Sequence, residues 1–299
     1  MTALRTVGLG KRYGPVVALA DLDLAVEEGE VFGSLGPNGS GKTTTIRLVM
    51  GLARADTGRA EVFGLDAQAR PVEAHRRIGY VPGEAALWPS LTGAETLHLL
   101  GRVQGRVDEA YRDELVRRYE VDLDKKVRAY SKGNRQKLLL VAGFMARPDL
   151  LVLDEPTSGL DPLMEEVFRA CVREARDRGQ TVFLSSHILG EVEALCDRVG
   201  ILRAGRLVEV GTLAQLRHLA AVTVEATFEG PPPDVSAVPG VVDAVTTDHT
   251  LTCRVQGSMA PLVAVLAQTP PVRLTSREPS LEELFLAQYG NPTEVTAAP

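Results

Sequence analysis

Several features that usually direct the interpretation of a sequence are scarce in these 299 residues. No apolar run approaches the 18 residues that a membrane-spanning helix needs. The three cysteines are scattered and form no Cys-x-x-Cys pair, which argues against a disulfide framework or a zinc site. The opening stretch MTALRTVGLGKRYG has no continuous apolar core, so we expect no signal peptide and a cytosolic location.

The net charge of −6 is unevenly distributed along the chain. Residues 1–218 contain 30 basic and 30 acidic side chains, whereas residues 219–299 contain 3 basic and 9 acidic ones. This change in composition predicts a domain boundary near residue 219. Neither part carries the basic excess that is typical of nucleic-acid binding, so we expect no nucleic-acid partner.

Apolar runs alternate with helical patterns through much of residues 1–218. The run at 31–35 is followed by a glycine-rich turn and a helical stretch, and the run at 150–153 is flanked by aspartates, as expected of a buried parallel strand. This alternation predicts an α/β fold with a sheet covered on both faces. Residues from about 90 to 146 show helical patterns with few strand signals, which indicates a helical subdomain inserted into the α/β domain.

Residues 219–290 have the pattern of a small α+β domain. Alternating segments at 222–228 and 249–255 flank the proline-rich connector PPPDVSAVPG. A helix is expected over 259–268, a strand over 272–276, and a final helix in SLEELFLAQYG, where Ser280 is a suitable N-cap. We expect residues 291–299 to form a frayed tail.

One motif in the first domain points directly to phosphate chemistry. The stretch GPNGSGKTT fits the P-loop pattern G-x-x-x-x-G-K-[ST] and lies between the predicted strand and helix. In such a loop, backbone N–H groups cradle phosphates, Lys42 reaches the β and γ phosphates, and the Thr43 hydroxyl binds Mg²⁺. The predicted nucleotide-binding residues are Gly36, Pro37, Asn38, Gly39, Ser40, Gly41, Lys42, Thr43 and Thr44.

A pair of carboxylates ends the apolar strand LLVL. Parallel strand order places Asp154 beside the P-loop, where it can hold the Mg²⁺ shell together with Thr43. The next residue, Glu155, points in another direction and can orient or deprotonate the attacking water. The two motifs together predict an Mg²⁺-dependent nucleoside triphosphatase.

The segment DEPTSGLD, which ends at Asp161, resembles the Walker B motif and D-loop of ABC-type ATPases. The resemblance implies an ABC cassette, ATP as the nucleotide, and Asp161 as a further nucleotide-site residue. It also implies that His187, in SSHIL, is the switch histidine that hydrogen-bonds the γ-phosphate. Tyr13, 29 residues before Lys42, resembles the aromatic residue that stacks on adenine.

The family also carries a signature sequence, usually LSGGQ, for which this chain has YSKGN at residues 130–134. Ser131 and Gly133 match the family pattern, whereas Lys132 and Asn134 depart from it. In the family this loop caps the ATP that the partner cassette holds, so Ser131 and Gly133 are implied ligands across a dimer. Where the family has a glutamine after Tyr80-Val81-Pro82, this chain has Gly83, and whether these departures reduce hydrolysis stays open.

The resemblance implies an ATP-binding and ATP-hydrolysing subunit of an ABC transporter. It implies a homodimer or heterodimer of cassettes at the cytoplasmic face of the membrane, peripheral to a separately encoded polytopic permease. The late motif EPSLEELFL resembles an extension on subunits of bacterial drug, antibiotic and lipid exporters, which favours export. Two alternatives remain: a ribosome- or DNA-associated ABC ATPase, and a nucleotide-dependent regulator with weak hydrolysis.

Overall fold

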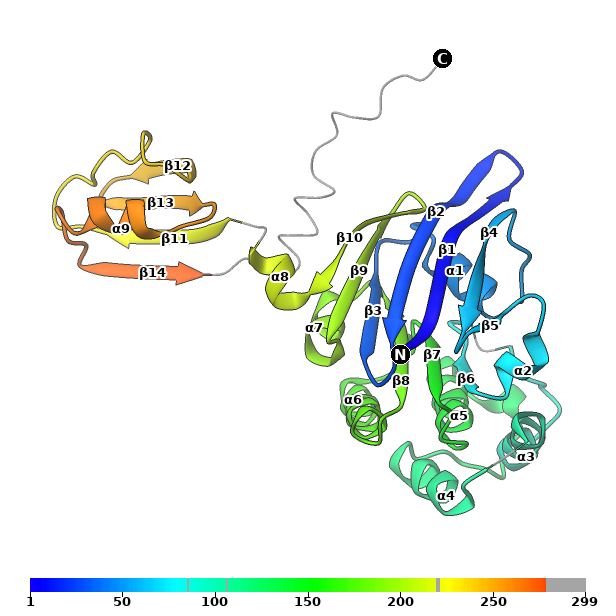
Figure 1. Ribbon diagram of the computed structural model, residues 1–299. Coiled ribbons are helices and arrows are strands. Elements are labelled where there is room, and N and C mark those ends of the chain that lie inside the picture. Colours follow the sequence, from blue (N-terminus) through cyan, green and yellow to red (C-terminus); the bar gives the residue numbers. More distant parts are fainter. Residues whose placement is uncertain (85, 106, 219–220, 278–299) are drawn as a thin grey trace. The chain divides into compact units, whose positions relative to one another are not determined.

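The computed structural model describes residues 1–84, 86–105, 107–218 and 221–277 (Figure 1). It divides the chain into two compact units, Met1–Val210 and Gly211–Pro299, so the division falls eight residues before the boundary expected from the charge distribution. The helix predicted in SLEELFLAQYG, the EPSLEELFL motif and the predicted tail lie outside the described residues.

A six-stranded sheet with the order β10-β9-β3-β8-β7-β6 forms the centre of the first unit. Its strands are β3 (Val31–Leu35), β6 (Ile78–Val81), β7 (Leu150–Asp154), β8 (Thr181–Ser186), β9 (Arg198–Arg203) and β10 (Arg206–Thr212). Five of them, from β9 to β6, pair in parallel. Every residue of β3, β7 and β8 is buried, which explains why these strands are apolar runs rather than alternating segments.

A second sheet in this unit was not expected from the sequence. It is antiparallel, with the order β2-β1-β4-β5, and comprises β1 (Thr2–Tyr13), β2 (Val16–Glu27), β4 (Thr57–Val62) and β5 (Leu65–Asp66). One hydrophobic core joins the two sheets, because Leu4, Leu22 and Val62 cluster with Phe32 and Phe183. The rings of Phe32 and Phe183 are stacked, with their centroids 5.9 Å apart.

Helices cover the sheets and fill the segment between β6 and β7 (Figure 1). They are α1 (Lys42–Val49), α2 (Pro71–His75), α3 (Gly93–Gln104), α4 (Glu109–Arg118), the 3₁₀ helix η1 (Val127–Ala129), α5 (Lys132–Phe144), α6 (Pro162–Asp177) and α7 (Leu189–Leu195). Helix α1 contacts β4 of one sheet and β7 of the other, while α5 packs on β6 and α6 on β8. Within the described ranges, no helix is both long and apolar enough to cross a bilayer.

The second unit has a sheet of its own. Its elements are α8 (Leu213–His218), β11 (Val222–Thr227), β12 (Val241–Thr247), β13 (Thr250–Val255), α9 (Ala260–Leu266) and β14 (Arg273–Arg277). The four strands are antiparallel in the order β12-β13-β11-β14. Val224, Leu251 and Cys253 of the sheet form a separate core with Leu262 and Leu266 of α9.

Candidate functional site

The loop between β3 and α1 has a backbone that only glycine suits at several positions. Gly39 and Gly41 have φ values of 80° and 112°, in the region that side chains disfavour. A Cβ atom at Gly36 would lie 2.5 Å from the Leu202 carbonyl oxygen, so a side chain there would clash with backbone. The glycines of the motif therefore allow the turn that exposes backbone N–H groups at the start of α1.

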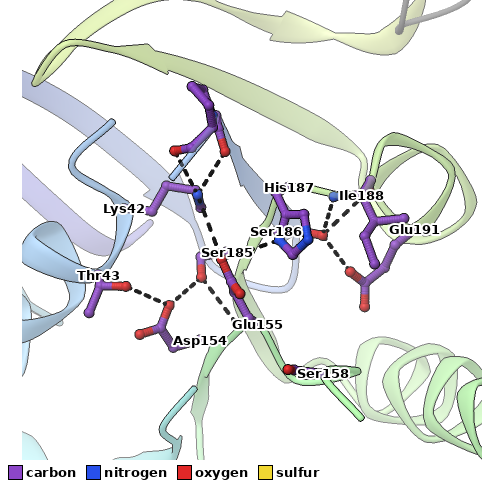
Figure 2. A network of polar contacts seen from close by, with 12 residues as sticks. Lys42, Thr43, Asp154, Glu155, Ser158, Ser185, Ser186, His187, Ile188 and Glu191 are labelled. Carbon is purple, nitrogen blue, oxygen red and sulfur yellow. Dashed lines mark hydrogen bonds and ion pairs between the residues drawn. The ribbon is translucent and has the colours of Figure 1, made fainter. Parts of the chain in front are cut away.

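Lys42, the first residue of α1, folds its side chain back over this loop (Figure 2). Its Nζ donates to the carbonyl oxygens of Gly36 at 2.7 Å and Pro37 at 3.1 Å, and it lies 3.8 Å from Glu155 Oε1. The side chain is only 4% exposed. Burial lowers the pKa of Lys42, and the nearby carboxylates of Glu155 and Asp154 oppose that change. A buried cation is thus held where the loop turns.

Asp154, at the end of β7, faces the first turn of α1 (Figure 2). Its Oδ1 accepts from Ser185 Oγ at 2.5 Å and from Thr43 Oγ1 at 3.3 Å. Burial raises the pKa of Asp154, while the Ser185 and Thr43 hydroxyls oppose that rise. A hydroxyl and a carboxylate side by side are the oxygen donors that Mg²⁺ prefers, and this ion normally takes its remaining ligands from water and phosphate. The donor set of Thr43 and Asp154 therefore fits Mg²⁺.

Glu155 continues the chain in a left-handed conformation, with φ at 46°. This conformation is unfavourable for a residue with a side chain and persists only where the surroundings enforce it. Here the Glu155 N–H donates to the Ser185 carbonyl oxygen at 3.1 Å, and its Oε1 lies 3.3 Å from His187 Nδ1. The turn therefore directs the Glu155 carboxylate toward Lys42 and His187, away from the contacts that Asp154 makes (Figure 2).

Ser185 is a residue of this site that the sequence interpretation missed. Its side chain binds the carboxylate of Asp154, and its backbone carbonyl binds the N–H of Glu155, so it fixes both acidic residues. Ser185 stands two residues before His187, near the end of a strand paired in parallel with β7, so only the strand register could have indicated its role. In that register Ser185 lies directly opposite Asp154.

The signature segment, defined here as residues 130–134, contacts a different part of the chain. Ser131 caps α5 by accepting from the Asn134 N–H at 3.2 Å. Lys132 Nζ donates to Ser158 Oγ at 3.0 Å, and a Cβ atom at Gly133 would lie 2.5 Å from the Gly159 carbonyl oxygen. These contacts place the signature segment against residues 156–161, which follow Glu155 and are called the 156–161 loop below.

Other predicted residues lie outside the cluster of contacts around Lys42. Asp161 caps α6, where it accepts from the Met164 N–H at 3.0 Å. Tyr13 ends β1 and is 46% exposed, and Lys11 Nζ lies 5.4 Å from the centre of its ring. In the P-loop, Asn38 is exposed, Ser40 is buried and Thr44 is half-buried.

Gly83 lies against the acidic strand end. A Cβ atom at this position would be 3.1 Å from the Asp154 carbonyl oxygen, so the chain passes close to β7 here. The neighbouring Glu84 is exposed and makes no ion pair with a described residue. The structure thus brings a backbone, rather than the side chain usual in the resembled family, next to Asp154.

Five predicted residues, Lys42, Thr43, Asp154, Glu155 and His187, come from three separate segments and meet at one edge of the parallel sheet; we call them the P-loop cluster. They combine a phosphate-binding loop, a buried cation, an oxygen pair suited to a divalent ion, and a carboxylate next to a histidine. This combination can bind a triphosphate, neutralise its charge and orient a water molecule for attack on the terminal phosphate.

Comparison with known proteins gives consistent matches. Residues 19–158 match the family model described as ABC transporter. The chain is 37% identical over 314 residues to a daunorubicin resistance ATP-binding protein of Streptomyces coeruleorubidus, covering 99% of each chain. It is 33% identical over 302 residues to a Nod factor export ATP-binding protein of Rhizobium etli, covering 98% of this chain and 95% of the relative.

A solved structure of an ATP-binding subunit of an ABC transporter superposes on the first unit's fold. It has a TM-score of 0.68 and 32% sequence identity, and the match covers 72% of this chain and 92% of the other. The predicted α/β fold class of an ABC-type cassette is therefore confirmed.

Proposed function

This chain belongs to the family of ABC transporter ATP-binding proteins, whose members bind and hydrolyse ATP, and from that premise we propose that it drives an exporter. The observation that carries the catalytic part of the proposal is the convergence of Lys42, Glu155 and His187 beside a glycine-rich loop. Phosphoryl transfer needs positioning and charge neutralisation more than covalent chemistry, and this arrangement supplies both.

Each side chain of the P-loop cluster has a definite task in this proposal. The loop amides and Lys42 hold the β and γ phosphates. When ATP binds, Lys42 Nζ gives up its bonds to the Gly36 and Pro37 carbonyl oxygens and donates to phosphate oxygens instead. The Glu155 carboxylate orients the attacking water and accepts its proton. His187 Nδ1 lies 3.3 Å from Glu155 Oε1 and holds that carboxylate in place, and the other ring nitrogen would face the γ-phosphate. The strained φ of Glu155 fits a residue held for a task rather than for stability.

Magnesium is the second cofactor in the proposal. Thr43 and Asp154 would hold it, since their oxygens lie 3.3 Å apart beside the P-loop. When bound, the ion would neutralise charge on the phosphate oxygens. The Ser185 hydroxyl keeps the Asp154 carboxylate turned toward Thr43.

Export is favoured by what the relatives are named for. One is a daunorubicin resistance protein and another is a Nod factor export protein, and each aligns over nearly the whole of this chain. These names favour transport over a ribosome- or DNA-associated role. We propose that the chain acts peripherally at the cytoplasmic face of the membrane on a separate polytopic permease.

A pair of cassettes is part of the same proposal. The signature residues Ser131 and Gly133, with Asp161, would complete the ATP site of a partner cassette, which is either a second copy or a related chain. Export would then follow from closure of the pair on ATP and reopening after hydrolysis.

The direct test joins two measurements on the full chain. Phosphate release from ATP should require Mg²⁺ and stop when EDTA removes it. When the chain is expressed with its genomic neighbours and purified by a tag, a polytopic membrane protein should co-purify. Recovery with ribosomes instead would contradict the transport role, while Mg²⁺-independent hydrolysis would contradict the role of Thr43 and Asp154.

A further inference from the structure

One buried carboxyl group near the site has no task in the mechanism above. Glu191, in the first turn of α7, is 3% exposed. Among the described residues it forms no ion pair, although burying an unpaired carboxylate is costly. It stands four residues after His187, on the short helix that begins where the His187 turn ends. Its position therefore calls for an explanation beyond folding.

The contacts of Glu191 lead to the two residues that flank His187 in the chain. Ser186 Oγ donates to Glu191 Oε2 at 2.5 Å and accepts from the Ile188 N–H at 2.9 Å. One hydroxyl thus closes the turn between residues 186 and 188, with His187 at its centre (Figure 2). Because the hydroxyl gives its proton to Glu191, its oxygen lone pairs are directed toward the Ile188 N–H.

We propose that Glu191 is a positioning residue for ATP hydrolysis, which holds His187 in place through the Ser186 hydroxyl. The inference rests on the proposed role of His187 and adds a residue behind it. The chain of contacts runs from Glu191 through Ser186 to the turn that carries His187, and from His187 Nδ1 to Glu155 Oε1 at 3.3 Å. Loss of the carboxyl would free the turn and misplace the imidazole.

The surroundings of Glu191 agree with this role. Burial raises its pKa, and the hydroxyls of Ser186 and Thr157 oppose the rise. Thr157 belongs to the 156–161 loop, so Glu191 lies between the turn that carries His187 and the loop that follows Glu155. On α6, Glu165 raises the pKa further and Arg169 lowers it. Titratable groups whose pKa is shifted by burial are more frequent at functional sites than elsewhere.

The test separates positioning from folding by two substitutions. Glu191→Met keeps the length of the side chain and removes the acceptor; the lost bond from Ser186 and the relief of a buried unpaired carboxyl oppose each other, so thermal stability should stay nearly unchanged. We expect kcat to fall roughly tenfold to hundredfold, as for other displaced active-site groups, with KM for ATP nearly unchanged. Glu191→Gln keeps an oxygen that accepts from Ser186 and should restore most of kcat. Glu114→Met, on the distant α4, is the matched control.

A double-mutant cycle then tests the route through His187. In the His187→Ala background, Glu191→Met should reduce kcat by less than about twofold, because the residue it positions is gone. A full additional loss in that background would overturn the proposal, as would a Glu191→Met enzyme with parental kcat. If His187→Ala itself left hydrolysis unchanged, the proposed role of His187 would fail, and the inference would fail with it.

Discussion

Two parts of the first unit carry the residues predicted for the nucleotide site, and they are held in different ways. The P-loop cluster is joined within one chain: Glu155 lies 3.8 Å from Lys42 and 3.3 Å from His187, and Asp154 lies 3.3 Å from Thr43. The signature segment is tied instead to the 156–161 loop, through Lys132 and Ser158. Gln136 adds a buried bond from its Nε2 to the Pro156 carbonyl oxygen at 2.9 Å.

This difference shows which part of the site a single chain completes by itself. The P-loop cluster has its cation, its acidic pair and its histidine already in contact, so ATP binding should need no second chain. The signature segment contacts the loop that follows Glu155 rather than the phosphate-binding loop. Its effect on hydrolysis within one chain must therefore pass through that loop.

The largest effect should come from removing the carboxylate of Glu155. Glu155→Gln keeps the size of the side chain but removes the base, so hydrolysis should fall by roughly 10²- to 10⁴-fold. ATP binding should persist, and an ATP-locked dimer should accumulate, which size-exclusion chromatography with ATP would detect. The control is Glu73→Gln, at an exposed residue of α2 that pairs with Arg70.

Parental hydrolysis by Glu155→Gln would show that another group activates the water. The P-loop cluster would then bind ATP without supplying the base for hydrolysis, and the two parts of the site would differ less than the contacts indicate.

Removing the buried cation should have the next largest effect, on binding. Lys42→Ala deletes charged hydrogen bonds to phosphate and leaves Glu155 without its neighbouring cation. We expect the Kd for ATP to rise roughly tenfold to hundredfold, the range of a charged hydrogen bond. Isothermal titration calorimetry measures this, with the exposed Lys126→Ala as the control. Unchanged affinity would contradict the phosphate-binding role of the loop.

A smaller effect, on hydrolysis rather than on ATP binding, is expected for the signature segment. Gly133→Ala would place a Cβ atom 2.5 Å from the Gly159 carbonyl oxygen, so the 156–161 loop must move. Hydrolysis should fall by about tenfold, because a shift of this size displaces Glu155, while the ATP affinity of the single chain stays within about twofold. Gly230→Ala, where a Cβ meets no atom within 4 Å, is the control. Equal losses in ATP binding and hydrolysis would show that the signature segment acts on the P-loop cluster itself and not through the 156–161 loop alone.

The sequence predicted the parallel strands and the helical segment well, because both have strong local patterns. The runs 31–35 and 150–153 coincide with β3 and β7, in which every residue is buried. The antiparallel sheet was missed because β1 is interrupted by irregular pairing and β2 mixes buried and exposed residues without strict alternation. Strand β12 was missed next to the proline-rich connector, since most of its residues are exposed.

The candidate site was predictable where a motif fixes the residue and its spacing. The P-loop, Asp154 and Glu155 follow from strand-end placement, and the structure brings Thr43 and His187 to them. Ser185 and Glu191 were not predictable in this way, because their roles depend on strand register and on burial in three dimensions. Nothing in local composition distinguishes Ser185 from any other serine at a strand end.

The smallest effect concerns stability, and its sign should differ between the regions. Burial raises the pKa of Asp154, so the folded state holds its proton at pH values where the unfolded chain has lost it. Stability therefore falls as the pH rises from the unfolded pKa through the folded pKa, and the cost remains at neutral pH. Asp154→Asn removes that cost and should raise stability, while Ser131→Ala removes a helix cap and should lower stability by about 1 kcal/mol.

Thermal unfolding of the nucleotide-free full chain at pH 7 measures both changes: Asp154→Asn should raise Tm, and Ser131→Ala should lower it by about 2–4 °C. The contrast follows from the surroundings, because burial disfavours the charged form of Asp154, whereas the Ser131 hydroxyl accepts the Asn134 N–H and so completes α5. The gain from Asp154→Asn should shrink as the pH falls through the raised pKa of Asp154, because the folded state then holds the proton. A destabilised Asp154→Asn variant would mean that the bonds from Ser185 and Thr43 outweigh the burial of the charge.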